Sequence, residues 1–264
     1  MLEKLKKLKS KIRYSTLYKS SVKKKIKASL GTIEKDASGF FGKFKLEKFR
    51  GEKIFKLFCT FPFKSVLDVG AGDAKSSLEF VKNRRQTDII ELSTSYYFKK
   101  KMKNFNKIYI GDFVKKKFSK KYDAIYISHV LEHQENIKLF LDKVFSSLKK
   151  KGFLCIIVPP RKPFIISGHY NFFNQGLLCY RLVMSKFNCQ KIKIITYDYN
   201  IGIILKKKEI KKFPKLRGDI GDLDKLKNYF PKKFRENRDF LEGFNGDIQF
   251  INLSKKETKI FKTT

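Results

Sequence analysis

The sequence predicts an α/β fold, in which a mostly parallel sheet is covered by helices on both faces. Two observations support this prediction. From residue 63 onward, short apolar runs alternate with stretches of helical periodicity, which is typical of parallel strands joined by right-handed crossovers. The runs are also almost continuously apolar and rich in β-branched residues, as expected for strands that are buried on both faces.

The predicted elements follow one another along the chain. Five strands are expected within "KSVLDVG", "QTDIIELS", "KIYIGDF", "YDAIYIS" and "GFLCIIVPP", and helices are expected at 75–84, 95–104 and 135–150. After residue 160 a helix is expected at 175–186, followed by two strands within "KIKIITYDYNIGIILKKK" that join near Asp198–Gly202. A helix at 221–229 and a short apolar run, "IQFINL", complete the pattern.

The composition gives a net charge of +36, from 61 Lys and Arg against 25 Asp and Glu in 264 residues. A positive charge of this size is compatible with three kinds of binding partner: nucleic acid, an anionic membrane surface, or an anionic substrate. The basic residues are mostly lysine, and the chain has 27 Phe and no Trp. This indicates a general compositional bias, because a dedicated RNA groove more often interleaves arginine with aromatic residues.

The cysteines and the N-terminus indicate a cytoplasmic protein. Cys59, Cys155, Cys179 and Cys189 form no C-x-x-C pair, and Cys155 is predicted to be buried. No secretory signal and no apolar run of transmembrane length is expected. The spacing of Leu2, Leu5, Leu8 and Ile12 predicts a basic amphipathic helix, which either docks on the core or contacts anionic lipid at the inner membrane surface.

The segment "LDVGAGDA" follows the first strand and opens a helix. Gly70 permits a sharp turn, Gly72 permits close approach of a ligand, and Ala74 stands at the third small position. Glu91, 19 residues after Gly72, ends the next strand, where a carboxylate can accept both hydroxyls of an adenosine ribose.

Two features argue against a dinucleotide dehydrogenase. Asp68 lies two residues before the first glycine, which departs from the dinucleotide pattern. "GDF" ends the third strand and places Asp112 and Phe113 where a carboxylate and an aromatic ring can meet an adenine.

With the fourth strand, "YDAIYISHVLEH", the chain resembles the class I S-adenosylmethionine-dependent methyltransferases, in particular small-molecule enzymes with an "SHVLEH" motif after strand four. The resemblance is strongest over residues 60–160. It implies a Rossmann-like, mostly parallel seven-stranded sheet at 61–204, with a basic helical N-terminal extension or lid at 1–60 and a mixed C-terminal appendage at 205–264.

The resemblance also implies the cofactor, S-adenosyl-L-methionine, and the residues that bind it. Asp68, Gly70 and Gly72 would surround the methionine part, Glu91 would bind the ribose, and Asp112 with Phe113 would hold the adenine. Ser128 and His129 would lie beside the sulfonium methyl. Ala74, where the family commonly has a third glycine, is a mild departure.

His129, Glu132 and His133 also spell H-x-x-E-H, the zinc-ligand pattern of inverted metalloproteases. That chemistry needs both histidines on one helix and a third ligand, for which Glu209 in a lysine-rich segment is a poor candidate. The glycine motif upstream favours a strand end here, so we expect no metal. Leu131 should pack, and Glu132 should cap the following helix.

Methylation of an alcohol requires removal of its proton, which a histidine near neutral pH can accept. His169, His133 and His129 all follow strands four and five, at the expected active edge. His169 is the first candidate for the base, His133 the second, and Tyr170 and Asn171 could orient a polyol.

The acceptor is expected to be a sugar or glycan precursor, because "GHYNFFNQGLL" with "YDYNIGIIL" resembles enzymes of surface-polysaccharide pathways. An anionic nucleotide- or lipid-linked carrier would suit the basic surface. The alternatives are a quinone or lipid-type molecule, RNA, and a binding protein with a degenerate cofactor fold. The amino-methylase pattern Asn/Asp-Pro-Pro-aromatic is absent after strand four, which makes nucleic acid the less favoured partner.

Overall fold

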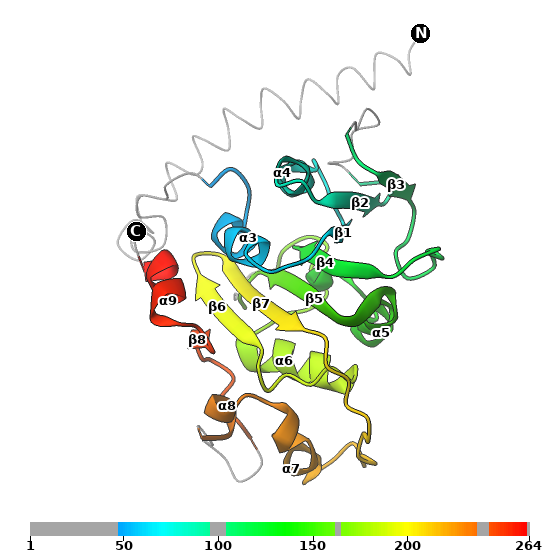
Figure 1. The fold of residues 1–264 in the computed structure, drawn as a ribbon. Helices are drawn as coiled ribbons and strands as arrows, with labels where there is room; N and C mark the ends of the chain where they lie inside the picture. The colour runs from blue at the N-terminus through cyan, green and yellow to red at the C-terminus, as the bar shows by residue number, and fades with distance from the viewer. Residues whose placement is uncertain (1–46, 96–103, 162–164, 237–242, 263–264) are drawn as a thin grey trace. The chain divides into compact units, whose positions relative to one another are not determined.

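The structure, a computed structural model, describes residues 47–95, 104–161, 165–236 and 243–262. Its central feature is an eight-stranded sheet in the order β3-β2-β1-β4-β5-β7-β6-β8 (Figure 1). The strands are β1 (Ser65–Val69), β2 (Gln86–Glu91), β3 (Lys107–Ile110), β4 (Tyr122–Ser128), β5 (Leu148–Val158), β6 (Lys193–Tyr197), β7 (Asn200–Lys206) and β8 (Phe250–Ile251).

The sheet has two parts of different orientation. The first five strands pair only in parallel, whereas β7 pairs antiparallel with both β5 and β6, and β8 pairs antiparallel with β6. The predicted Rossmann-like methyltransferase sheet is confirmed. It contains one strand more than the seven expected, because two residues of "IQFINL" add β8 at the edge beside β6.

The predicted helices within the described residues are also confirmed. The prediction for 95–104 falls mostly, and that for the N-terminal amphipathic helix entirely, outside these residues. The helices are α3 (Glu52–Cys59), α4 (Lys75–Lys82), α5 (Ile137–Ser147), α6 (Gln175–Met184), α7 (Asp222–Leu226), α8 (Lys232–Glu236) and α9 (Lys255–Lys262), with 3₁₀ turns at Leu131–His133 and Lys227–Tyr229.

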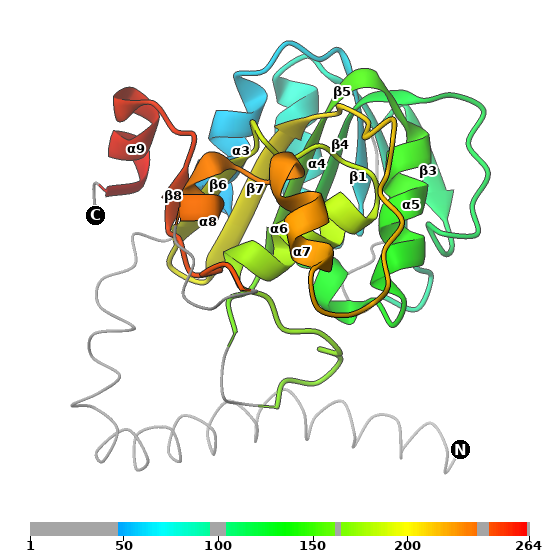
Figure 2. The same ribbon diagram turned by 90° about the horizontal axis from the view of Figure 1, so that it is seen from below.

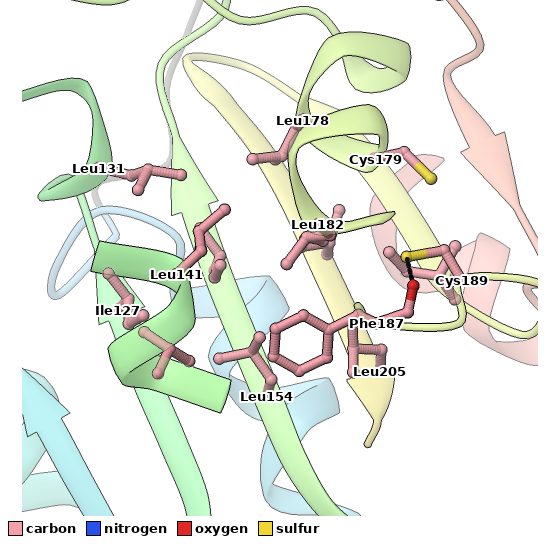
Figure 3. Close-up of a cluster of buried hydrophobic side chains, with 14 of the residues drawn as sticks. Ile127, Leu131, Leu141, Leu154, Leu178, Cys179, Leu182, Phe187, Cys189 and Leu205 are labelled. Carbon is pink, nitrogen blue, oxygen red and sulfur yellow. Dashed lines mark hydrogen bonds between the residues drawn. The ribbon is translucent and has the colours of Figure 1, made fainter. Parts of the chain in front are cut away.

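Helices cover both faces of the sheet, as Figure 2 shows. Alternate residues of each central strand enter different cores. Ile125 and Ile127 of β4 pack with α5 and α6, whereas Ala124 and Tyr126 pack with α3 and α4. Figure 3 shows part of the first core, where Leu182 of α6 lies over the sheet. This two-sided burial explains why the strands are apolar at nearly every position.

The helix α3 packs tightly on the sheet. Its residues Ile54, Phe55 and Phe58 are at most 3% exposed and belong to the second core. Gly202 of β7 permits this contact, because a β-carbon at that position would lie 2.2 Å from Cδ1 of Ile54. Residues 52–59 therefore contribute to the core despite the lysine-rich sequence around them.

The four cysteines are free thiols, and Cys155 is buried, as predicted. Over the part of the chain that the structure describes, no helix combines the length and the apolar character needed to cross a membrane.

Candidate active site

The turn after β1 has an unusual backbone. Gly70, Gly72 and Ala74 have φ angles of 72°, 57° and 59°, a left-handed conformation that glycine adopts without steric cost. Gly70 N donates to Ile90 O of β2 over 2.9 Å. A β-carbon on Gly70 would lie 2.3 Å from Cγ2 of Val130, so the turn after β4 lies directly against the glycine turn.

Asp68 lies beneath this turn and is only 1% exposed. Its Oδ2 accepts hydrogen bonds from the hydroxyls of Ser76 and Ser77 in α4, at 2.9 and 2.5 Å. Burial raises the pKa of Asp68 to about 6, although the two serine hydroxyls act in the opposite direction. Asp68 thereby fastens the start of α4 to the end of β1.

Glu91 ends β2 at the carboxyl edge of the sheet. Its Oε2 accepts from Gly72 N at 2.6 Å and its Oε1 from Leu92 N at 2.8 Å. Because each carboxylate oxygen has two lone pairs, both can accept further hydrogen bonds from a ligand. Glu91 therefore joins the glycine turn to the end of the neighbouring strand.

Asp112 and Phe113 follow β3 but differ in environment. Asp112 is exposed, and its Oδ1 accepts from Val114 N at 2.8 Å. The ring of Phe113 is 5% exposed and packs against Phe140 and Phe118, with centroids 5.1 and 5.8 Å away. The expected aromatic face of Phe113 is therefore covered by the core, and of these two residues only Asp112 is exposed.

The fourth strand ends at Ser128, and His129 adopts a left-handed backbone with φ of 54°. His129 N donates to Ile157 O of β5 over 2.8 Å. On the side chain, Nε2 lies 3.1 Å from Oδ1 of Asn200, and the ring stacks at 6.2 Å on Tyr199. His129 is thus held where β4, β5 and the start of β7 meet.

The side chains of His133 and His169 are in contact with each other. Their ring centroids are 4.9 Å apart in an edge-to-face arrangement. His133 Nδ1 donates to Gly168 O over 2.6 Å, so the loop after β5 is tied to the turn after β4. The structure brings all three histidines to one place, because Glu132 Oε1 lies 3.4 Å from His129 Nδ1 and 3.9 Å from His133 Nε2.

The H-x-x-E-H sequence does not form a helix. His129 has a left-handed backbone and His133 closes a 3₁₀ turn, so the two do not share a helical face. Leu131 is fully buried, as expected. The expectation that Glu132 caps the following helix is wrong, because Asn136 caps α5 by accepting from Leu139 N.

The environment of His169 favours its neutral form. Burial lowers the pKa of His169, and the nearby charges of His133, His129 and Arg50 act in the same direction, against the opposing effect of Glu132. A neutral imidazole has a free lone pair and can accept a proton or bind a cation.

Three residues of this region were not expected from the sequence. They are Arg50, Tyr199 and Asn200. Arg50 lies 5.6 Å from the ring centroid of Tyr199. Asn200 begins β7, which runs antiparallel to β5 and therefore starts at the carboxyl edge. The "YDYN" turn could have indicated Tyr199 and Asn200. It joins two antiparallel strands, β6 and β7, and so places these residues at the carboxyl edge of the sheet.

The comparisons with known proteins agree with this architecture. A family described as "Methyltransferase domain" matches residues 43–181, more than half of the chain, so the chain belongs to this family. The class that the fold and the family define is the S-adenosylmethionine-dependent methyltransferases, enzymes whose methyl donor is S-adenosyl-L-methionine.

Several solved structures are similar to the chain at low identity. A Burkholderia thailandensis 1,6-didemethyltoxoflavin-N1-methyltransferase is 14% identical, with a TM-score of 0.49 over 72% of this chain and 89% of that one. A glycopeptide N-methyltransferase complexed with S-adenosylmethionine is 15% identical, with a TM-score of 0.46 over 58% and 92%. Mitomycin 7-O-methyltransferase is 10% identical, with a TM-score of 0.45 over 60% of this chain, which spans 53% of that enzyme. No curated protein sequence matches the chain.

Proposed function

We propose that this chain transfers a methyl group from S-adenosyl-L-methionine to a hydroxyl of a small polar acceptor, with a sugar or glycan precursor as the favoured class. The observation that carries the proposal is the gathering of His129, His133 and His169 around Glu132, next to Val130, which packs against the glycine turn. Imidazole is the side chain best suited to take up an alcohol proton near neutral pH.

The cofactor would be held along the carboxyl edge of the sheet. Gly70 and Gly72 give the close backbone approach, Glu91 would accept from the ribose hydroxyls, and Asp112 would face the adenine. The bound cofactor supplies an electrophilic methyl group on sulfur. Ser128 and His129 would line the position of that methyl group, because they end β4 beside the turn that contains Gly70.

The protein's own contribution is to orient the acceptor and remove its proton. We rank His169 first as the proton acceptor, His133 second and His129 third. Tyr170 is 64% exposed and Asn171 donates from Nδ2 to Gln134 O over 2.6 Å, which supports a polar acceptor beside His169. Arg50, exposed near Tyr199, supports an anionic carrier such as a nucleotide or lipid phosphate.

A methyl-transfer screen with isotope-labelled cofactor tests the proposal directly. Nucleotide sugars and glycan fragments should accept label, whereas quinone precursors and RNA should not. His169→Gln should remove turnover while S-adenosylhomocysteine binding persists, and Lys138→Gln, exposed on α5, should leave both unchanged. Labelling of RNA, with retention that weakens steeply with salt, would overturn the small-molecule acceptor.

A further inference from the structure

Glu132 differs from the other buried carboxylates in the described part of the chain. Its side chain is 1% exposed, yet neither oxygen has a hydrogen-bond partner. The remaining buried carboxylates all accept at least one hydrogen bond, and they are Glu52, Asp68, Asp88, Glu91 and Asp222. A buried carboxylate without a hydrogen bond is costly, so the surroundings of Glu132, whose Oε1 lies 3.4 Å from His129 Nδ1, favour a cation.

The neighbouring imidazole of His133 presents a lone pair to this carboxylate. Its Nδ1 faces the backbone oxygen of Gly168 at 2.6 Å, and since that oxygen only accepts, Nδ1 carries the proton. In the neutral ring the free lone pair is then on Nε2, which lies 3.9 Å from Glu132 Oε1. A hydrogen bond from the far ring nitrogen to a carbonyl is also the arrangement that orients metal-binding histidines.

His169 completes the cluster from the loop after β5. One ligand atom each from Glu132, His133 and His169 lies within 4.8 Å of the others. Ligand atoms around a tetrahedral ion are about 3.3 Å apart, so modest side-chain rotations would bring the three into coordination. The side chain of His133 is 42% exposed, which leaves the cluster open on one side to an ion and a substrate.

We propose that Glu132, His133 and His169 bind a divalent first-row transition metal ion of the Zn²⁺ type. Two imidazole nitrogens and one carboxylate suit such an ion and leave a coordination position open, whereas Mg²⁺ prefers oxygen ligands. The site differs from the H-x-x-E-H pattern, because His129 is replaced by the distant His169. It also revises the expectation, drawn from the sequence, that no metal is bound.

The inference deepens the proposed function, and its catalytic meaning rests on that function. With the ion bound, His133 and His169 would act as its ligands, and the ion would take over their proposed role as base by lowering the pKa of an acceptor hydroxyl bound at the open position. An acceptor with two adjacent hydroxyl or carbonyl oxygens is then favoured, since both oxygens could be positioned by one ion.

Zinc titration of the chelator-treated full chain tests the site. Zn²⁺ should bind with a stoichiometry of one and a Kd below about 1 μM, and it should raise the Tm, whereas Mg²⁺ should do neither. Glu132→Gln, His133→Ala and His169→Ala should each weaken Zn²⁺ binding by at least about 10-fold to 100-fold. Cys59→Ser, which removes the partly exposed thiol, should bind Zn²⁺ as the wild type does.

Binding of S-adenosylhomocysteine separates this test from that of the proposed function. The three variants should retain it, which shows that they are folded. As a second readout in the unaltered chain, bound Co²⁺ should show the visible absorption of a low-coordinate site. The metal proposal is overturned by the absence of Zn²⁺ binding, or by Zn²⁺ binding that survives both Glu132→Gln and His169→Ala. Failure of the chain to bind S-adenosylhomocysteine would count instead against the proposed function.

Discussion

Glu91 Oε2 accepts a hydrogen bond of 2.6 Å from Gly72 N, which joins the end of β2 to the glycine turn after β1. The carboxylate also accepts from Leu92 N at 2.8 Å, so it is held by two backbone amides at the carboxyl edge. The two bonds fix the orientation of the carboxylate and leave lone pairs on both oxygens, on which its proposed role in binding the ribose depends.

Glu91→Gln should weaken binding of S-adenosylhomocysteine by about 10-fold to 100-fold, because hydrogen bonds to a charged group contribute about 1.5–3 kcal/mol. Isothermal titration calorimetry measures the change. Glu79→Gln, which removes only an ion pair with Lys82 on α4, is the control and should bind as the wild type does. Equal affinities of the Glu91 variant and the wild type would remove Glu91 from the proposed cofactor site.

Gly70→Ala should greatly reduce both cofactor binding and thermal stability. The new methyl group would lie 2.3 Å from Cγ2 of Val130, and φ of 72° is unfavourable for alanine. Adding Val130→Ala should recover part of the lost Tm, since it relieves the clash but not the backbone strain. An unaffected single variant, measured by thermal unfolding and calorimetry, would contradict the close packing of the two turns.

Much of the fold was accessible from the sequence because the strands are β-branched, apolar and bounded by glycine or polar residues. The eighth strand was not, since two paired residues of "IQFINL" give no periodicity of their own and depend on β6 beside them. The core role of α3 was also missed, because the lysines around Ile54 and Phe58 suggest a solvated helix. The close packing of α3 on the sheet depends on Gly202 of β7, which is far from α3 in the sequence.

The candidate site likewise contains some features that could be predicted from the sequence and others that could not. Gly70, Gly72 and Glu91 follow a local motif, so their proximity could be predicted from their spacing. The contact of His133 with His169 joins positions 36 residues apart and depends on the path of the loop after β5. The burial of Glu132 could not be predicted from the sequence around it. A Glu close to the start of a helix is more often exposed to solvent, where its charge interacts favourably with the helix N-terminus.

Asp68 should make the stability of the protein depend on pH between about 4 and 6. Burial raises its pKa from 3.8 to about 6, so the folded state holds the proton more tightly than the unfolded state. Its contribution to stability is therefore full below about pH 3.8 and is lost as the pH rises through about 6, by about 3 kcal/mol at most.

The Asp68→Asn variant does not titrate at this position and isolates the effect. Its Tm relative to the wild type should increase as the pH rises from about 4 to about 6 and then level off. A Tm difference that is constant over this range would show that Asp68 does not titrate there.

Leu182→Ala should lower the free energy of unfolding by about 2–5 kcal/mol, because Leu182 is fully buried between α6 and the sheet (Figure 3). Leu177→Ala, on the same helix but 38% exposed, should cost far less. Urea unfolding of the two variants gives both values, and similar losses would contradict the packing of α6.

Binding of S-adenosylhomocysteine to the full chain tests the central claim most directly. A ligand at 100 times its Kd stabilises the native state by about 2.7 kcal/mol, which for a chain of this size raises the Tm by about 5 °C or more. The account predicts saturable binding of one molecule per chain, with that rise in Tm abolished or strongly reduced in Gly70→Ala. No heat of binding and no change in Tm at millimolar ligand would contradict it.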